Sequence, residues 1–187
     1  MTAARTIFER DGFLDARIVD ITALAETASG SFYTYFNSKE EIFQSVVDQL
    51  TEEGLHPPSL DFLDGAEGDF EKLIERHHRG YLEMYQRNAK MMAVIEEVTS
   101  ISDKFLHWRT QQAQPYVERN VAALRYLQRA GLADKKLDPL LATRALSGMV
   151  SRAAFITFVL EDEDRKAVGG LAKTLTRLWM NALALHR

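Results

Sequence analysis

Apolar residues recur at helical spacing along nearly the whole chain of 187 residues. We find no segment in which apolar and polar residues alternate between turn signals, so no β-strand is indicated. Hydrophobic residues make up 46% of the sequence, against 10 Gly and 4 Pro. This composition excludes collagen-like, low-complexity and disordered proteins. The sequence therefore predicts an all-α globular protein with about nine helices.

Turn and cap residues divide the helical pattern into segments. The expected helices are one between Ser38 and His56 and others over about residues 2–10, 17–25, 28–36, 69–87, 89–98, 102–130, 139–160 and 164–186. Pro115 predicts an interruption of the long helix 102–130, because proline lacks a backbone donor. His56-Pro57-Pro58 ends the fourth helix and predicts two domains, residues 1–50 and residues 51–187.

Short-range signals predict where several helices begin and end. Gly12 can take a left-handed conformation at the end of the first helix, and Gly131 can do so after the long helix. Asp15 is the expected N-cap of the second helix, and Asp138 that of the next-to-last helix. The run Ser38-Lys39-Glu40-Glu41 has the spacing of a capping box at the start of the fourth helix.

Two short helices separated by about three residues, the second brief and rich in hydroxyls, form a predicted helix-turn-helix motif. Phe32 and Phe36 are four residues apart, so both are expected to point into the core. Such a helix fits the major groove of DNA, where hydroxyls reach phosphates and base edges. The side chains left outside are Ser29, Gly30, Ser31, Tyr33, Thr34 and Tyr35. Lys39, at the start of the next helix, is a candidate phosphate contact.

The charge of this region argues against a strong general attraction to nucleic acid. Residues 1–50 hold four basic and eight acidic side chains, and the whole chain has a net charge of −4. DNA binding would therefore depend on the local placement of a few side chains. A helical module that binds a small molecule or a partner, without binding DNA, remains an alternative.

The segment Gly30-Ser31-Phe32-Tyr33-Thr34-Tyr35-Phe36-Asn37-Ser38-Lys39-Glu40-Glu41, with Asp20 to Ala25 before it, closely resembles the DNA-binding domain of the tetracycline-repressor (TetR) family. The resemblance covers about residues 3–50. It implies a homodimeric transcriptional regulator, most often a repressor, that binds a palindromic operator in double-stranded DNA and is released by a small hydrophobic effector. The DNA-binding residues it implies are Arg17, Ser29, Gly30, Ser31, Tyr33, Thr34, Tyr35 and Lys39.

Three features depart from the family pattern. The first helix is short and lacks a basic arm before it. Glu26 stands where the turn commonly has Gly, which costs about 1 kcal/mol if this position needs a positive φ. Ala28 replaces a common Ser cap, so Thr27 is the expected substitute.

Large side chains in the rest of the chain predict the lining of an effector site. Met and aromatic residues suit irregular apolar ligands, and Arg109 could pair with an anionic group. The expected lining residues are Tyr81, Tyr85, Met92, Trp108, Arg109 and Phe155. The same residues at helical spacing also fit a closely packed core.

The two last helices predict a dimer interface. Helix 139–160 is apolar around much of its circumference, and Gly148 with its small neighbours would let another helix approach. Together the two helices could form a two-fold four-helix contact. The expected interface residues are Met149, Ala153, Leu171, Leu175, Leu178 and Trp179. The alternative is that the body of the protein simply covers both helices.

The sequence offers no support for an enzyme, a cofactor or a metal. It has no Cys, no glycine-rich phosphate loop and no pair of His residues four apart on a helix. His77 and His78 are adjacent, which does not place them on one face. Neither a signal peptide nor a membrane span is indicated, so a cytoplasmic protein is expected.

Overall fold

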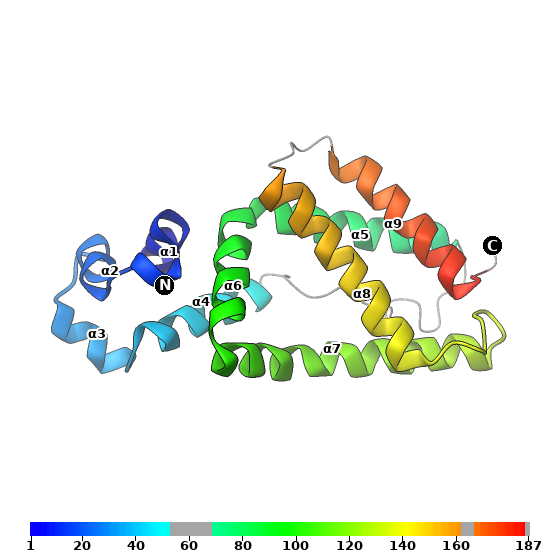
Figure 1. Cartoon of the computed structure of the whole chain (residues 1–187), viewed down its shortest axis with the longest axis horizontal. Helices are drawn as coiled ribbons and strands as arrows, with labels where there is room; N and C mark the ends of the chain where they lie inside the picture. Colours follow the sequence, from blue (N-terminus) through cyan, green and yellow to red (C-terminus); the bar gives the residue numbers. More distant parts are fainter. Residues whose placement is uncertain (53–68, 162–166, 186–187) are drawn as a thin grey trace. The chain divides into compact units, whose positions relative to one another are not determined.

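The computed structural model describes residues 1–52, 69–161 and 167–185, and over these residues it contains helices and no strand (Figure 1). The predicted all-α fold is therefore confirmed. The elements are α1 (Thr2–Asp15), α2 (Ile18–Leu24), α3 (Ser29–Tyr35), α4 (Lys39–Glu52), α5 (Phe70–Arg87), α6 (Ala89–Ile101), α7 (Asp103–Arg129), α8 (Pro139–Phe155), the π-helical turn η2 (Ile156–Leu160) and α9 (Ala167–Leu183).

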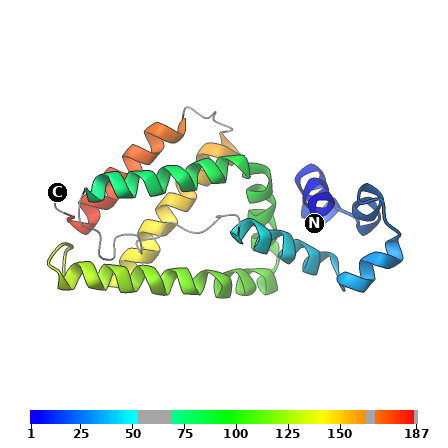
Figure 2. The same cartoon turned by 180° about the vertical axis from the view of Figure 1, so that it is seen from behind.

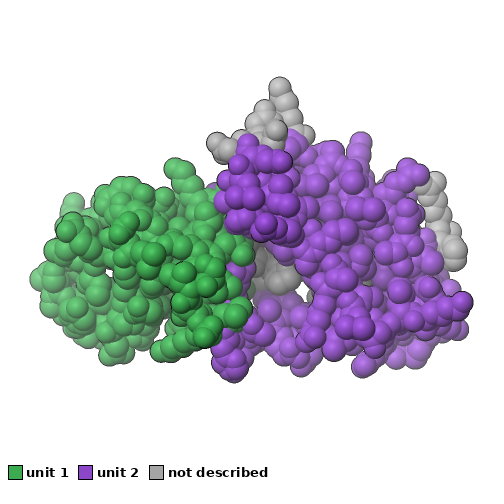
Figure 3. All heavy atoms as spheres, viewed as in Figure 1, with its two compact units in different colours: residues 1–55, 88–106 green, residues 56–87, 107–187 purple. Residues whose placement is uncertain are grey.

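The chain forms two compact units (Figure 3). Unit 1 consists of Met1–Leu55 and Asn88–Leu106, and unit 2 consists of His56–Arg87 and His107–Arg187. Unit 1 thus contains α6, a helix distant in sequence from α1 to α4, and α1 packs against it. The functional division at residue 50 stays a prediction.

A cluster of phenylalanine rings forms the core of unit 1. Phe43 on α4 is fully buried, and its ring centroid lies 5.0 Å from that of Phe8, 5.0 Å from that of Phe13 and 5.2 Å from that of Phe105. Such edge-on and tilted contacts add to the free energy of burying the rings. The cluster joins α1 and α4 to the first turn of α7.

The first helix differs from the prediction at its end. Gly12 has the expected positive φ, at 75°, but the helix bends there and continues to Asp15. Asp15 is therefore the last residue of α1, and the prediction that it caps α2 is wrong, because Arg17 occupies the N-cap position of α2 and its side chain does not bond to the amides of that helix. The bend is held by Glu97 of α6, whose carboxylate accepts a hydrogen bond of 3.3 Å from the Phe13 amide.

Only one of the two hydrogen bonds of the predicted capping box forms. The Ser38 hydroxyl accepts a hydrogen bond of 3.2 Å from the Glu41 amide, as expected. The Glu41 carboxylate, however, accepts from the backbone amide and the side-chain amide of Asn37, at 2.7 Å and 2.9 Å. These bonds hold the pKa of Glu41 below its usual value.

Unit 2 is built on α5, which packs against α9 and α8 (Figure 2). His78 of α5 is fully buried: its Nδ1 lies 3.0 Å from the Thr176 hydroxyl, and its ring meets Trp179 edge-on at 4.8 Å. Burial, assisted by the neighbouring His77, lowers the pKa of His78 to about 3. The imidazole is therefore neutral at physiological pH and behaves as part of the core.

Some of the other predictions for unit 2 are confirmed, and one is wrong. Asp138 caps α8 by accepting from the Leu141 amide at 2.8 Å, and Gly131 has the expected positive φ, at 76°. The predicted interruption at Pro115 is wrong, because α7 runs through it. Residue 111, which loses its backbone partner to this proline, is exposed, so solvent can hydrate its carbonyl.

Two expected helix ends, at His56-Pro57-Pro58 and at Asp164, lie outside the described residues. Within the described ranges, each helix is either too short or too polar to cross a membrane.

Candidate nucleic-acid interface

The seven residues of α3 divide between core and solvent as predicted. Phe32 is 5% exposed, and its ring lies 5.6 Å from that of the half-buried Phe36. Tyr33 and Tyr35, by contrast, are 60% and 77% exposed. Ser29, Gly30, Ser31 and Thr34 are also exposed. The helix therefore presents a continuous face of hydroxyls and aromatic rings that unit 1 does not cover.

A tight turn sets the position of α3 relative to α2. Glu26 has a φ of 53°, which is the left-handed conformation. This explains why glycine is common at this position in the tetracycline-repressor family. Thr22 of α2 is buried, and its hydroxyl lies 3.1 Å from the Val19 carbonyl and 3.2 Å from the Ser29 hydroxyl. This contact joins the two helices at the start of α3.

The expected cap of α3 by Thr27 is wrong. Ala28 is the N-cap residue, and no side chain bonds to the amides there. The Ser31 amide donates to the Ala28 carbonyl at 2.9 Å, so the amides that a phosphate oxygen could accept from are those of Ser29 and Gly30, which precede this bond. Apart from its chain neighbours and the backbone of its own helix, no atom of the described residues lies within 4 Å of the position a Gly30 Cβ would take, so the backbone on this side is exposed.

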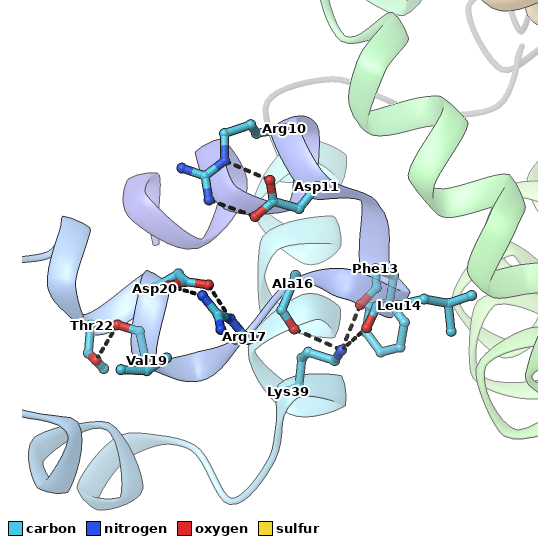
Figure 4. Close-up of polar contacts among 10 residues, drawn as sticks. All are labelled: Arg10, Asp11, Phe13, Leu14, Ala16, Arg17, Val19, Asp20, Thr22 and Lys39. Carbon is cyan, nitrogen blue, oxygen red and sulfur yellow. Dashed lines mark hydrogen bonds and ion pairs between the residues drawn. The ribbon is translucent and has the colours of Figure 1, made fainter.

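Lys39 has a structural role that the sequence did not reveal (Figure 4). Its ammonium donates to the carbonyls of Phe13, Leu14 and Ala16, at 2.7 Å, 3.0 Å and 2.9 Å, and lies 4.7 Å from the centre of the Phe13 ring. A lysine ammonium has three donors, and these bonds account for all of them. Lys39 therefore anchors the end of α1, and the expected phosphate contact would require it to give up these bonds.

Arg17 lies at the start of α2 with its side chain 72% exposed. It donates to both carboxylate oxygens of Asp20, at 2.7 Å and 3.0 Å, and this contact raises the pKa of the guanidinium (Figure 4). Arg10 makes a similar pair with Asp11. Asp20 occupies two of the five donors of Arg17, so the guanidinium keeps others for a phosphate.

The residues expected to line an effector site are divided between the two units. Met92 lies in unit 1, and the other five lie in unit 2. Tyr81 and Tyr85 are buried with ring centres 5.8 Å apart, and the Tyr81 hydroxyl donates to Ser151 at 3.3 Å. Phe155 is half-buried with the Arg152 guanidinium 4.9 Å from its ring centre. Trp108 and Arg109 are half-buried on α7.

The residues expected at a dimer interface differ in exposure. Leu175 and Trp179 are 3% and 1% exposed, so they pack in the core of unit 2, and their part in a dimer stays a prediction. Leu178 is 46% exposed, whereas Met149, Ala153 and Leu171 are half-buried. Leu141 and Leu160, which the interface prediction did not include, are 65% and 61% exposed.

Comparison with known proteins gives three kinds of match. Residues 1–46 match the model of the family described as bacterial regulatory proteins, tetR family. The uncharacterized HTH-type transcriptional regulator YfiR of Bacillus subtilis is 25% identical over 188 residues, which is 93% of this chain and 85% of that protein. The HTH-type transcriptional repressor NicS of Pseudomonas putida is 38% identical over 50 residues, which is 27% of this chain and 24% of that protein.

Solved structures share the fold. The transcriptional regulator FadR of Bacillus subtilis, in complex with stearoyl-CoA, has a TM-score of 0.75 at 16% identity, with 97% of this chain and 96% of that chain covered. An identity this low shows the fold alone. Residues 1–46, the helix-turn-helix part of the chain, match the tetracycline-repressor family of transcriptional regulators, as the sequence predicted.

Proposed function

We propose that this protein is a ligand-responsive transcriptional repressor that binds double-stranded operator DNA through α3. The observation that carries the proposal is the exposed face of α3, where Tyr33 and Tyr35 are 60% and 77% exposed beside four small residues. Exposed aromatic rings close together form the kind of apolar patch that marks an interaction site, and the remaining side chains are small enough for the helix to approach base edges closely. The repressor NicS, which matches over 50 residues, supports the direction of regulation.

In the proposed complex, α3 lies in the major groove and α2 crosses the backbone. The tyrosine hydroxyls and the amides of Ser29 and Gly30 bind phosphates, and Ser31 and Thr34 face the bases. Arg17, on the α2 side, supplies the charge contact. Lys39 contributes indirectly, because its bonds to the carbonyls of α1 keep the three helices together.

The net charge of the chain determines how steeply its DNA affinity should depend on salt. With a net charge of −4 and with Arg10 and Arg17 paired to carboxylates, few cations are left to displace counterions. The affinity should therefore fall with salt less steeply than for a strongly basic protein. Removing Arg17 should reduce the slope of log affinity against log salt by about 1 per bound chain.

Operator binding also requires two copies of the chain. A homodimer places two α3 helices about 34–36 Å apart, so that they reach successive major grooves of a palindromic site. The exposed leucines of unit 2, Leu141, Leu160 and Leu178, support a contact of this kind.

We place the protein in the cytoplasm, where it would meet DNA, and we assign it no catalytic role, cofactor or metal.

The effector is proposed to be small and hydrophobic. Unit 2 carries the buried aromatic pair Tyr81 and Tyr85, and FadR, which shares the fold, was solved with stearoyl-CoA. An effector that binds one conformation better than the other would change operator affinity by a coupling free energy of about 1–3 kcal/mol.

The proposal is tested by selecting duplexes from a random pool with the full chain. Enrichment of a two-fold symmetric sequence is expected. On that duplex, Tyr33→Ala combined with Tyr35→Ala should weaken binding by at least about tenfold, because two exposed aromatic contacts are lost. Tyr126→Ala is the matched control, since Tyr126 is 36% exposed on α7. Failure to enrich any duplex would favour the module without DNA binding.

A further inference from the structure

Unit 1 contains a pocket of about 210 Å³ that none of the predicted sites includes. Its walls come from the end of α1, the start of α4, the end of α6 and the first turn of α7. The rings of Phe13, Phe43 and Phe105 line it together with the aliphatic side chains of Val98 and Ile101. All these residues belong to the same compact unit as α3.

The size and lining of the pocket indicate the kind of molecule it would hold. Apolar cavities of about 150 Å³ can take up benzene, whereas sites for drug-sized ligands are about 300–1,000 Å³. A volume of about 210 Å³ lies between these limits and suits one or two fused rings. Aromatic walls favour offset or edge-on contact with another ring. Ile101, at 52% exposed, leaves apolar surface that such a ring would cover.

The polar groups of the pocket favour an uncharged molecule. Among the residues that the structure describes, the charged ones lining it are Glu40 and Lys104, which have opposite charges and are both exposed, so a charged ligand gains from one and loses to the other. Gln44 and Ser102 also line the pocket and supply neutral groups that can bond to one polar substituent.

The pocket is connected to the anchor of α1 by direct contacts. Phe13 lines the pocket, and the Lys39 ammonium lies 4.7 Å from the centre of its ring. The same ammonium bonds to the Phe13 carbonyl at 2.7 Å, and the Phe13 amide bonds to Glu97 of α6 at 3.3 Å. A molecule that moved the Phe13 ring would therefore disturb the bonds that set where α1 ends and α2 begins.

We propose that this pocket binds a small neutral aromatic molecule, of one or two rings, and that its occupancy shifts the Lys39 anchor of α1. The consequence for DNA affinity rests on the proposed function, but binding in the pocket does not. This site lies in the DNA-binding unit and is distinct from the effector site proposed for unit 2.

Indole is a suitable probe because it is neutral, has two fused rings and carries one N–H donor. With the full chain and methyl-labelled Ile, Leu and Val, saturable shifts are expected on addition of indole, with nuclear Overhauser contacts from its ring to Ile101 and Val98. The carbonyl resonances of Phe13, Leu14 and Ala16 should shift with the same saturation curve. Contacts that map to other methyl groups, or shifts that do not saturate, would overturn the site.

Blocking the pocket sharpens the test. Ile101→Trp places a ring in the opening and should weaken indole binding by at least about tenfold. Leu24→Trp is the matched control, because Leu24 is 49% exposed on α2 and Ile101 is 52% exposed. Equal affinity for indole in the Ile101→Trp variant and the wild type would contradict the proposal.

Benzoate, an anionic aromatic molecule, tests whether the pocket prefers an uncharged ligand. It should bind more weakly than indole, and tighter binding would show that the proposed ligand class is wrong.

These outcomes separate the inference from the proposed function. Indole binding is measured without DNA, so it can succeed even if no operator is selected. If an operator is selected and indole does not bind, only the pocket proposal fails. If indole binds without moving the three carbonyl resonances, the connection to Lys39 is wrong.

Discussion

Helices α3 and α9 both carry large aromatic residues that the sequence assigned to contact surfaces, and the structure treats them in opposite ways. On α3, Tyr33 and Tyr35 are 60% and 77% exposed. On α9, Trp179 is 1% exposed and lies against His78 of α5. The difference follows from the length of the apolar stripe. The seven residues of α3 contribute one fully buried side chain, Phe32, and leave the others in solvent.

The comparison shows how an aromatic residue can be interpreted. On a long helix with an apolar stripe, an aromatic side chain that falls on the stripe belongs to the core. On a short helix whose other residues are small and polar, aromatic side chains off the stripe are exposed, and several of them together form a patch that marks an interaction site. The predictions below test both halves of this rule.

The largest expected effect is on the stability of unit 2. Trp179→Ala should lower the free energy of unfolding by about 3–5 kcal/mol, because it leaves a cavity between α5 and α9. Tyr35→Ala should change it by no more than about 0.5 kcal/mol, because that side chain is exposed. Urea denaturation of both variants measures the difference. Comparable losses would show that the division between core and contact surface is wrong.

The second prediction concerns the anchor of unit 1. Lys39→Met keeps the length of the side chain and removes three bonds to carbonyls, so the free energy of unfolding should fall by about 2 kcal/mol. Lys72→Met is the control, since Lys72 has an 80% exposed side chain paired with Asp69, and it should cost less than about 1 kcal/mol. If Lys39→Met leaves stability unchanged but weakens DNA binding, Lys39 acts on phosphate after all.

A third prediction follows from His78. Its pKa of about 3 in the folded chain lies below the usual value of 6.5, so the unfolded chain binds more protons between these values. Stability is therefore fully present above pH 6.5 and falls as the pH is lowered towards 3. Between pH 6.5 and pH 5 the loss should be about 2 kcal/mol.

His78→Gln should be less stable at neutral pH but should lack this pH dependence. The carboxylates whose pKa values are lowered, Asp11, Glu41 and Asp69, titrate below pH 5 and do not contribute in this window. Denaturation of the wild type, His78→Gln and His77→Gln at pH 7, 6 and 5 measures the effect. An equal slope in the wild type and His78→Gln would contradict a buried neutral imidazole.

The smallest expected effect is at the turn between α2 and α3. Glu26→Gly should raise the free energy of unfolding by about 0.5–1 kcal/mol, because glycine adopts a φ of 53° without strain. Glu118→Gly, in the exposed part of α7, should instead lower it by about 1 kcal/mol. A loss of stability in Glu26→Gly would mean that the glutamate side chain makes a contribution the structure does not show.

Features set by residues close in sequence were predicted well. The spacing of Phe32 and Phe36 was enough to divide α3 into a core face and an exposed face. The motif also pointed to a positive φ at Glu26, and the Asp138 cap depends only on residues three positions apart. In each case the interaction is within about one helical turn.

Features that depend on distant parts of the chain were missed. The partners of Lys39 lie 23 to 26 positions away, so its role depends on where α1 ends in space. The stripe of α9 was recognised, but a stripe does not say whether its own chain or a second copy covers it, and for Trp179 it is α5. No local signal places α6 with α1 or forms the pocket between them and α7.

The central claim, that α3 is the surface that binds DNA, is tested most directly by amide hydrogen exchange of the full chain with and without the selected duplex. The account predicts slower exchange in the amides of α3 and at the start of α2 when the duplex is bound, with no comparable change in the buried amides of α9. Unchanged exchange throughout α3 in a chain that demonstrably binds the duplex would contradict it.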